Sequence, residues 1–276
     1  MIKKSFAKIN LGLKIINQRK DGYHNIKSIF IQIDLNDSLH FLPSKQFKIE
    51  SRGIKVPTNR SNTVFKAVKL LEKKFNINIQ HKIIIDKKIP LGGGLGGGSS
   101  NAALTLITIA KLYKLNITNQ DLFSLASEIG SDVPFFLTGG IKMIEGTGNI
   151  ISNVNSSGLM NKKILLVFPE FNISTKWAYA QVKKHLHHND NHNKFSPLTK
   201  NVKWKLFNND FEKIVCTTYP EILKIKDILY KEGALYSGLS GSGSTVFGLY
   251  NDSISLNKIQ TLLSAYHTNI AFPILQ

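Results

Sequence analysis

The chain has very little cysteine and no long hydrophobic run. Its 276 residues include one cysteine, Cys216, so a disulfide within the chain is excluded and a reducing compartment such as the cytoplasm is expected. No stretch reaches the roughly 18 consecutive apolar residues that a membrane-spanning helix needs, so we expect no membrane partner. The 42% hydrophobic content is typical of a folded globular protein with one large domain or two smaller ones.

Acidic residues are also scarce. The chain has 18 acidic and 36 basic residues, a net charge of +18, which favours anionic partners. The lysines are spread along the whole chain without a block of five or more, and aromatic-and-basic RNA-recognition signatures are missing. We therefore expect an anionic small molecule and no nucleic acid, although the abundance of Ile, Asn and Lys leaves a bias of the encoding genome as another source of the charge.

The N-terminal stretch lacks acidic residues up to Asp21, which is a property of organelle presequences. Apolar and polar residues alternate from Phe6 to Ile16, however, and this pattern predicts a half-buried strand. We expect the segment to be part of the fold.

The order of the predicted elements indicates an α+β protein with two domains. In the first half, strands are predicted over 2–17, 25–35, 38–42, 46–52 and 77–86, and helices from Ser61, over 102–115 and over 119–128. In the second half, strands are predicted over 163–168, 235–238, 245–250 and at the end, and helices over 175–185, 207–216, 220–230 and 254–265. A polar break near 155–161 predicts domains 1–157 and 158–276, the second with helices on one face of an antiparallel sheet.

A histidine-rich stretch over 185–192 has the residue type that binds zinc, but it has neither the regular spacing nor the cysteines of structural zinc sites. Its asparagine-rich composition favours a solvated loop, and we assign no metal ligand there.

The stretch "PLGGGLGGGSSNAA", Pro90 to Ala103, has six glycines within seven residues. It has no lysine, so it does not match the Walker A pattern. The dinucleotide pattern G-x-G-x-x-G fits poorly, because the loop follows several strands and the sequence near position 117 supplies no suitable acidic residue. The composition still favours phosphate, since glycines allow close backbone approach and the helix expected to begin near Ser99 directs its free N–H groups at the loop.

Three stretches in order resemble the motifs of the GHMP kinases. They are "AKINLGL" from Ala7, the glycine-rich loop itself, and "LSGSGSTVFGL" from Leu239, which together cover nearly the whole chain. The resemblance implies a two-domain fold with an N-terminal kinase domain of the type shared with a ribosomal-protein domain and a ferredoxin-like C-terminal domain. It also implies ATP and Mg²⁺ as requirements.

The resemblance also implies roles for individual residues. Asp132 in "GSDVPFF" is the expected base, on irregular backbone because Pro134 disfavours helix before it, and Lys8 is its expected partner. Without the resemblance, the alternative for Asp132 is a structural role in a turn or as an N-cap, and the alternative for Lys8 is a solvated position on the surface. The ATP contacts are expected from Asn62, Lys88, Pro90, Leu91, Gly92, Gly93, Gly94, Leu95, Gly96, Gly97, Gly98, Ser99 and Ser100.

The stretches "RKDGYHNIKSIF" and "NDFE" are similar to members of the family that act on a cytidyl diphosphate ester. For such a substrate Tyr23 is expected to stack on the base and His24 to bind its edge, with Asn10, Thr175 and Tyr179 as further contacts. The alternative is a family member that acts on mevalonate, homoserine or a sugar, and packing in a helix is the alternative role of Tyr179. We expect a monomer or a weak homodimer.

Overall fold

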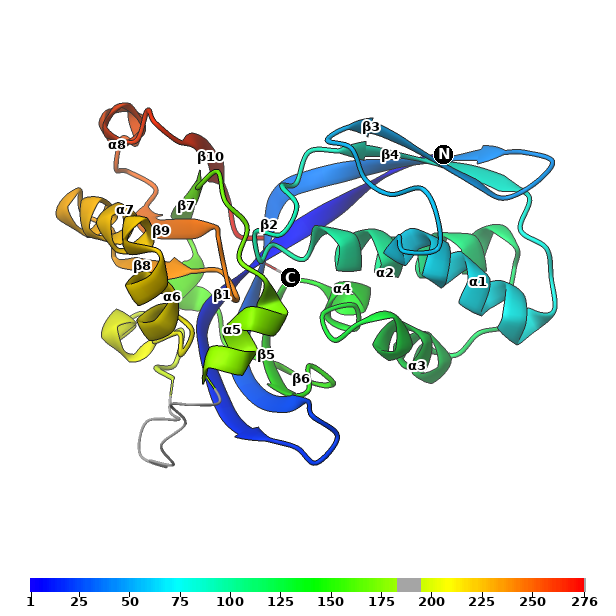
Figure 1. Ribbon diagram of the computed structural model, residues 1–276, viewed down its shortest axis with the longest axis horizontal. Helices are drawn as coiled ribbons and strands as arrows, with labels where there is room; N and C mark the ends of the chain where they lie inside the picture. The colour runs from blue at the N-terminus through cyan, green and yellow to red at the C-terminus, as the bar shows by residue number, and fades with distance from the viewer. Residues whose placement is uncertain (183–194, 276) are drawn as a thin grey trace. The chain divides into compact units, whose positions relative to one another are not determined.

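The computed structural model describes residues 1–182 and 195–275, and these form two compact units (Figure 1). The first unit consists of Met1–Ala7, Leu35–Pro90 and Gly96–Gly139, and the second consists of Lys8–Asp34, Leu91–Leu95 and Gly140–Gln276. Strands β1 (Ile2–Gln18) and β2 (His24–Pro43) are long enough to contribute residues to both units. None of the helices in the described ranges has the length and apolar character that crossing a membrane requires.

The first unit is a small sheet with helices on one face (Figure 1). The end of β2 pairs antiparallel with β4 (His81–Lys87), and β4 pairs parallel with β3 (Lys48–Gly53). The helices are α1 (Thr63–Phe75), α2 (Gly97–Leu112), α3 (Asn119–Ile129) and α4 (Phe135–Thr138). The apolar positions predicted for α1, Val64, Val68 and Leu71, are all completely buried, as its helical spacing requires.

Two predicted strands of the first half are a single strand. The predictions over 25–35 and 38–42 both fall in β2, whose early residues pair with β5 (Ile141–Gly146) and whose late residues pair with β4. Asp37 lies between the two predicted segments, and its side chain is completely buried. Strands β5 and β6 (Ile150–Asn153) were not predicted, and β4 begins later than its predicted start at residue 77.

The second unit contains a four-stranded antiparallel sheet in the order β10-β7-β9-β8. Its strands are β7 (Lys162–Phe168), β8 (Tyr236–Leu239), β9 (Val246–Asn251) and β10 (His267–Ala271). Its α-helices are α5 (Thr175–Val182), α6 (Glu212–Thr218), α7 (Pro220–Lys231) and α8 (Asn257–Leu262). Side chains from this sheet and all four helices form one buried apolar cluster, which confirms the predicted antiparallel sheet covered by helices.

Two details of the sequence-based prediction were wrong. The helix predicted from Phe207 begins at Glu212, because the backbone of residues 208–210 is bonded to Leu13 of β1 instead. The segment from Phe6 to Ile16 is a strand as predicted, but it is not half-buried. Lys8, Asn10 and Lys14 on its polar face are at most 8% exposed. The histidine-rich stretch 185–192 lies outside the described residues.

Candidate active site

The glycine-rich loop turns directly into helix α2. Gly92, Gly94 and Gly96 have φ angles of 69°, 74° and 67°, a region that favours glycine, and Gly96 is the N-cap. The helix therefore begins at Gly97, two residues before the predicted start near Ser99. Its first backbone bond runs from the Ser100 amide to the Gly96 carbonyl at 2.9 Å, so the three preceding amides have no acceptor within the helix.

Several glycines of the loop are also needed for packing. Within the second unit, a Cβ at Gly93 would lie 2.5 Å from Thr245 Oγ1, and one at Gly94 would lie 2.0 Å from the Ser240 carbonyl oxygen. The Ser240 hydroxyl in turn donates to the Gly94 carbonyl at 2.9 Å. The C-terminal glycine motif thus contacts the loop directly, and it forms the expected hairpin, in which the Ser240 amide donates to the Thr245 carbonyl.

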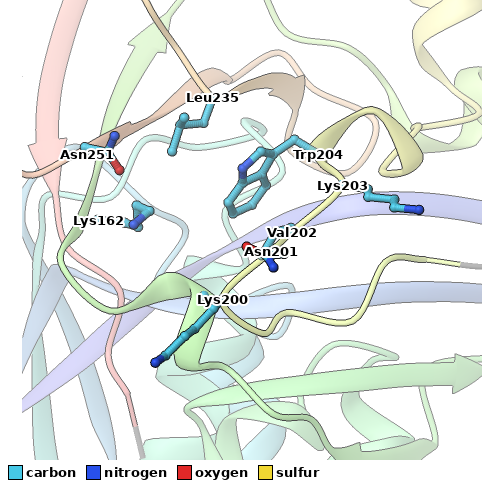
Figure 2. A pocket seen from close by; sticks show the side chains of 9 residues that line it. Lys162, Lys200, Asn201, Val202, Lys203, Trp204, Leu235 and Asn251 are labelled. Atoms are coloured by element: carbon cyan, nitrogen blue, oxygen red, sulfur yellow. The ribbon is translucent and has the colours of Figure 1, made fainter.

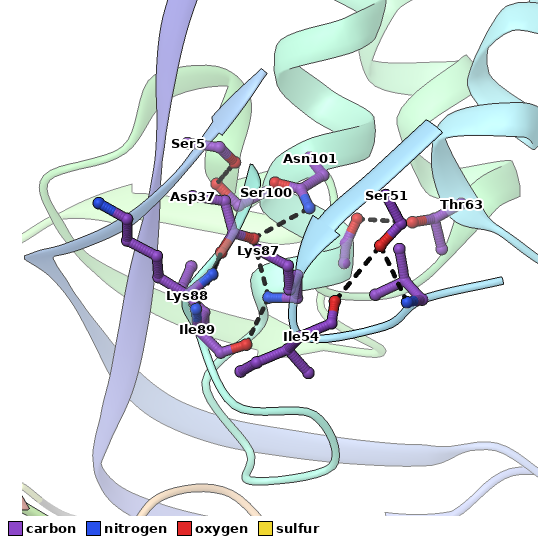
Figure 3. A network of polar contacts seen from close by, with 12 residues as sticks. Ser5, Asp37, Ser51, Ile54, Thr63, Lys87, Lys88, Ile89, Ser100 and Asn101 are labelled. Carbon is purple, nitrogen blue, oxygen red and sulfur yellow. Dashed lines mark hydrogen bonds and ion pairs between the residues drawn. The ribbon is translucent and has the colours of Figure 1, made fainter. Parts of the chain in front are cut away.

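A buried carboxylate holds the chain where it enters the loop. Asp37 of β2 accepts hydrogen bonds from Lys87 Nζ at 2.8 Å and from Asn101 Nδ2 at 3.0 Å (Figure 3). It also accepts from the backbone amides of Lys88 and Ile89, each at 2.9 Å. Asp37 thereby joins β2, the end of β4 and the second turn of α2, and so fixes both sides of the loop within the first unit.

Lys87 completes this arrangement. Its Nζ packs against the first turn of α2, because a Cβ added at Gly97 would lie 2.9 Å from it. Burial lowers the pKa of Lys87, while the attraction to Asp37 acts in the opposite direction. The sequence reasoning chose the neighbouring Lys88, whose side chain is exposed, and missed Lys87, Asp37 and Asn101. The alternation of side chains along β4 could have identified Lys87 as buried, because it lies on the same face of the strand as Ile83 and Ile85.

Lys8 is a buried cation in the second unit. Only 3% of the residue is exposed, its Nζ donates to Asn10 Oδ1 at 2.6 Å, and it lies 4.5 Å from the centre of the Phe30 ring. Its backbone amide donates to the carbonyl of Leu95 in the glycine-rich loop. The solvated surface lysine is thus excluded, and Lys8 shares a strand face with Asn10 as predicted. Asn10 continues the network by donating to Ser28 Oγ at 3.0 Å.

Asp132 belongs to the first unit and lies in the turn between α3 and α4. The turn is closed by a bond from the Val133 amide to the Gly130 carbonyl at 3.1 Å, and Val133 and Phe135 beside it are fully buried. The aspartate is therefore on irregular backbone anchored by apolar neighbours, as the "SDVP" sequence predicted, and its own side chain is partly exposed.

All the residues expected to contact the substrate lie in the second unit, and three of them have rings. The rings of His24 and Tyr179 are stacked, with centroids 4.7 Å apart and an interplanar angle of 25°. Tyr179 also meets Phe211 edge-on at 4.9 Å, so it packs against the core as well. Tyr23, in contrast, is 65% exposed.

The remaining predicted residues have defined local partners. Thr175 lies within 3.0 Å of the Ser242 hydroxyl of the C-terminal glycine motif. Asn62 is the N-cap of α1, with Oδ1 accepting from the Val64 amide and Nδ2 donating to the Pro57 carbonyl. In the described residues no group of three or more His, Cys, Asp or Glu side chains could hold a metal ion.

The "NDFE" stretch supports the C-terminal glycine motif. Asn209 Nδ2 donates to the carbonyls of Leu239 and Gly241 at 2.9 and 2.8 Å, and the Leu239 amide donates to Glu212 Oε1 at 2.8 Å. Asp210 binds Lys14 of β1 at 3.0 Å. The sequence analysis identified this stretch as a motif, but it did not predict that Asn209 and Glu212 bind the backbone of the C-terminal glycine motif.

Comparison with known proteins agrees with this geometry. Residues 62–140 match the GHMP kinases N terminal domain, and residues 194–267 match the GHMP kinases C terminal domain. The chain belongs to the GHMP kinase family. Its fold is the two-domain fold of that family, as expected from the three motifs.

Two relatives that are similar over nearly the whole chain carry the same name. The chain is 40% identical to the 4-diphosphocytidyl-2-C-methyl-D-erythritol kinase of Thermodesulfovibrio yellowstonii, over 95% of this chain and 94% of the relative. It is 35% identical to the protein of the same name from Thermoanaerobacter pseudethanolicus, over 98% and 94%. A solved 4-(cytidine 5'-diphospho)-2C-methyl-D-erythritol kinase superposes with a TM-score of 0.80 at 27% identity, over 99% of both chains. A homoserine kinase from Cytophaga hutchinsonii, 18% identical with a TM-score of 0.75, shares the fold.

Proposed function

We propose that this chain transfers the γ-phosphoryl group of ATP to the 2-hydroxyl of 4-diphosphocytidyl-2-C-methyl-D-erythritol, in the non-mevalonate route to isoprenoid precursors. The observation that carries the proposal is the shared name of relatives that are similar over nearly the whole chain. The paired rings of His24 and Tyr179 support it, because a cytidyl group offers a flat base and a mevalonate or homoserine acceptor does not.

The glycine-rich loop is the proposed ATP phosphate site. The amides of Gly97, Gly98 and Ser99 and the positive end of the α2 dipole favour negative charge at this point. The residues from Pro90 to Gly96 are proposed to line the phosphates with further backbone groups. Asn62 and Lys88 are proposed to contact the nucleoside part of ATP. No lysine lies between Pro90 and Ser100, so backbone N–H groups carry the recognition.

Lys8 and Asp132 are the proposed catalytic pair. Asp132 takes the proton of the substrate hydroxyl while that oxygen attacks the γ-phosphorus, and the bond to the β-phosphate oxygen breaks to release ADP. The Lys8 ammonium stabilises the charge that develops on the attacking oxygen. Asn10 holds this ammonium by its 2.6 Å bond and so limits the positions it can take.

Mg²⁺ is proposed as the companion of ATP. The described residues offer no cluster of three ligands, which fits an ion held mainly by nucleotide phosphates, the usual arrangement for Mg²⁺ in kinases. When bound there it neutralises phosphate charge. A cytoplasmic location and a monomer or weak homodimer complete the proposal, and light scattering after size exclusion would measure the mass in solution.

The decisive experiment measures ADP release from ATP and Mg²⁺ with a panel of acceptors. We expect release with the cytidyl substrate and formation of its 2-phosphate, identified by phosphorus NMR, and only background release with mevalonate, homoserine or galactose. Release with one of those acceptors and none with the cytidyl compound would refute the substrate assignment and leave the kinase class intact.

A further inference from the structure

A cavity of about 490 Å³ lies in the second unit, apart from every residue proposed above for catalysis or binding. It is lined by the start of β7, the end of β9, Leu235 before β8, Gly158 and the segment over 200–204 (Figure 2). Its volume falls within the range of roughly 300–1,000 Å³ that is usual for small-molecule sites. None of its nine lining residues is acidic.

The cavity has uncompensated positive charge. Lys162, Lys200 and Lys203 line it, and within the described residues none of the three takes part in an ion pair. Lys162 Nζ donates to a neutral acceptor, the Met160 carbonyl, at 3.2 Å. The nearby Asp252 accepts from Lys163, which does not line the cavity. The cavity therefore favours an anion.

One wall of the cavity is flat and apolar. The indole of Trp204 lies between Leu235 and Val202, as Figure 2 shows, with Lys162 and Asn251 on the side toward which the ring extends. In the same view Lys200 and Lys203 direct their ammonium groups away from the indole, and Lys162 lies on the side of the ring. An apolar ring surface beside ammonium groups fits a ligand that is flat at one end and anionic at the other.

The segment that carries Trp204 is fixed by backbone bonds. The Gly158 amide donates to the Leu198 carbonyl at 2.8 Å, and the Lys203 amide donates to the buried Ser196 hydroxyl at 2.9 Å. A Cβ at Gly158 would lie 2.5 Å from Val202 Cγ2, so the glycine allows this close packing. The cavity is thus largely formed before any ligand arrives, which lowers the entropic cost of binding.

We propose that this cavity is a second binding site, for a small organic phosphate with a flat apolar group. The ring stacks on Trp204, and the phosphate, a dianion, binds the ammonium group of Lys162, with Lys200 at the rim of the cavity adding positive charge. The carboxamides of Asn201 and Asn251 bind polar substituents. The proposal does not depend on the reaction at the active site.

Isothermal titration calorimetry with 1-naphthyl phosphate tests the site, with inorganic phosphate and 1-naphthol as probes of each half alone. We expect each half to bind at least about tenfold more weakly than the whole probe. We expect Lys200→Glu and Trp204→Leu each to weaken binding of 1-naphthyl phosphate by about tenfold or more. Lys224→Glu on α7 makes the same charge change away from the cavity and should leave the affinity unchanged.

Thermal melts check that each variant is folded. Lys200→Glu should keep the wild-type stability because the side chain of Lys200 is exposed. Equal weakening by Lys224→Glu would show attraction to the overall charge and overturn the proposal. So would unchanged affinity in the Lys200 and Trp204 variants, or no heat from the wild type at millimolar probe.

Discussion

The carboxylate of Asp37 and the ammonium of Lys87 are 2.8 Å apart, and their side chains are 0% and 2% exposed. The pair joins β2 to the end of β4, immediately before the glycine-rich loop. Desolvation of both charges offsets much of their attraction, so the pair by itself adds little stability. Removing one partner is different, because the other charge then stays buried without compensation.

We therefore predict that Asp37→Asn lowers the free energy of unfolding by about 3–5 kcal/mol. The asparagine NH2 group would replace one of the two accepting oxygens, so it would face either the backbone amides of Lys88 and Ile89 or the Lys87 ammonium and the Asn101 amide, all of which are donors. Urea denaturation at neutral pH measures the change. Asp252→Asn is the matched control, since its pair with Lys163 spans 3.9 Å and its side chain is 60% exposed, and it should cost no more than about 1 kcal/mol. Equal losses in the two variants would contradict the assigned role.

The glycines of the loop are predicted to differ in what they tolerate. Gly94→Ala places a Cβ 2.0 Å from the Ser240 carbonyl oxygen at a φ of 74°, so we expect a loss of about 2 kcal/mol or more, seen in thermal and urea unfolding. Gly98→Ala meets only Thr63 Oγ1 at 3.4 Å and lies in the first turn of α2, so its folding stability should be unchanged or raised by about 0.5–1 kcal/mol.

The same pair of variants separates packing from ATP binding. If the first turn of α2 holds the phosphates, the methyl group of Gly98→Ala raises KM for ATP although the protein is fully folded. A stable Gly98→Ala protein with unchanged KM for ATP would remove Gly98 from the phosphate site while leaving the packing argument intact.

Substitutions of the proposed catalytic pair should lower turnover without unfolding the protein. Asp132→Ala and Lys8→Met are each expected to reduce kcat by roughly 10² to 10⁴, the range for loss of a positioned base or charge. Lys8→Met keeps the length and apolar contact of the side chain beside Phe30. Steady-state kinetics with circular dichroism as a folding check provides the measurement. Near-wild-type kcat in both variants would exclude them from the mechanism.

The residues that sequence reasoning missed are those whose partners are distant in the chain. The strand, the helices and the glycine motif around Lys8 and Gly97 were predictable because local periodicity and composition determine them. Asp37 lies between two segments that were predicted as separate strands, and only the fold shows its partners about 50 to 64 positions later. The start of α2 was placed too late because glycines disfavour helix, whereas packing against Lys87 and Ile89 requires glycine at position 97.

Tyr179 is predicted to contribute to acceptor binding through its ring surface. Tyr179→Leu should raise KM for the cytidyl acceptor by about tenfold, because it removes the ring that stacks with His24 and that is proposed to bind the base. KM for ATP should be unchanged. Tyr179→Phe retains the ring and its edge contact with Phe211, so it is the matched control and should behave like the wild type. An unaltered acceptor KM in Tyr179→Leu would refute the stacking role.

The stability of the first unit should depend on pH through Asp121. Hydrogen bonds from Lys74 and then from Thr118 lower the pKa of this carboxyl from its ordinary value of 3.8 to about 2. Because the folded pKa is the lower one, the stabilisation is fully present above pH 3.8 and is lost as the pH falls from there toward 2. Asp121→Asn keeps a capping oxygen at N3 of α3 but loses the charge. The difference in unfolding free energy between wild type and variant should therefore be constant near neutral pH and shrink as the pH falls below 3.8.

Urea titrations from pH 6 downward measure this difference, and Lys74→Met provides an independent check because Lys74 Nζ is the principal cause, 2.7 Å from Asp121 Oδ1. Its loss should raise the pKa of Asp121, so that the Lys74→Met protein shows the same shrinking difference from the wild type in acid. The bonds that the Thr118 amide and hydroxyl donate to Asp121 Oδ2 remain in that variant, and part of the pH dependence should remain with them. A difference that stays constant through the acid range in both variants would mean that the charge of Asp121 does not stabilise the link between α1 and α3.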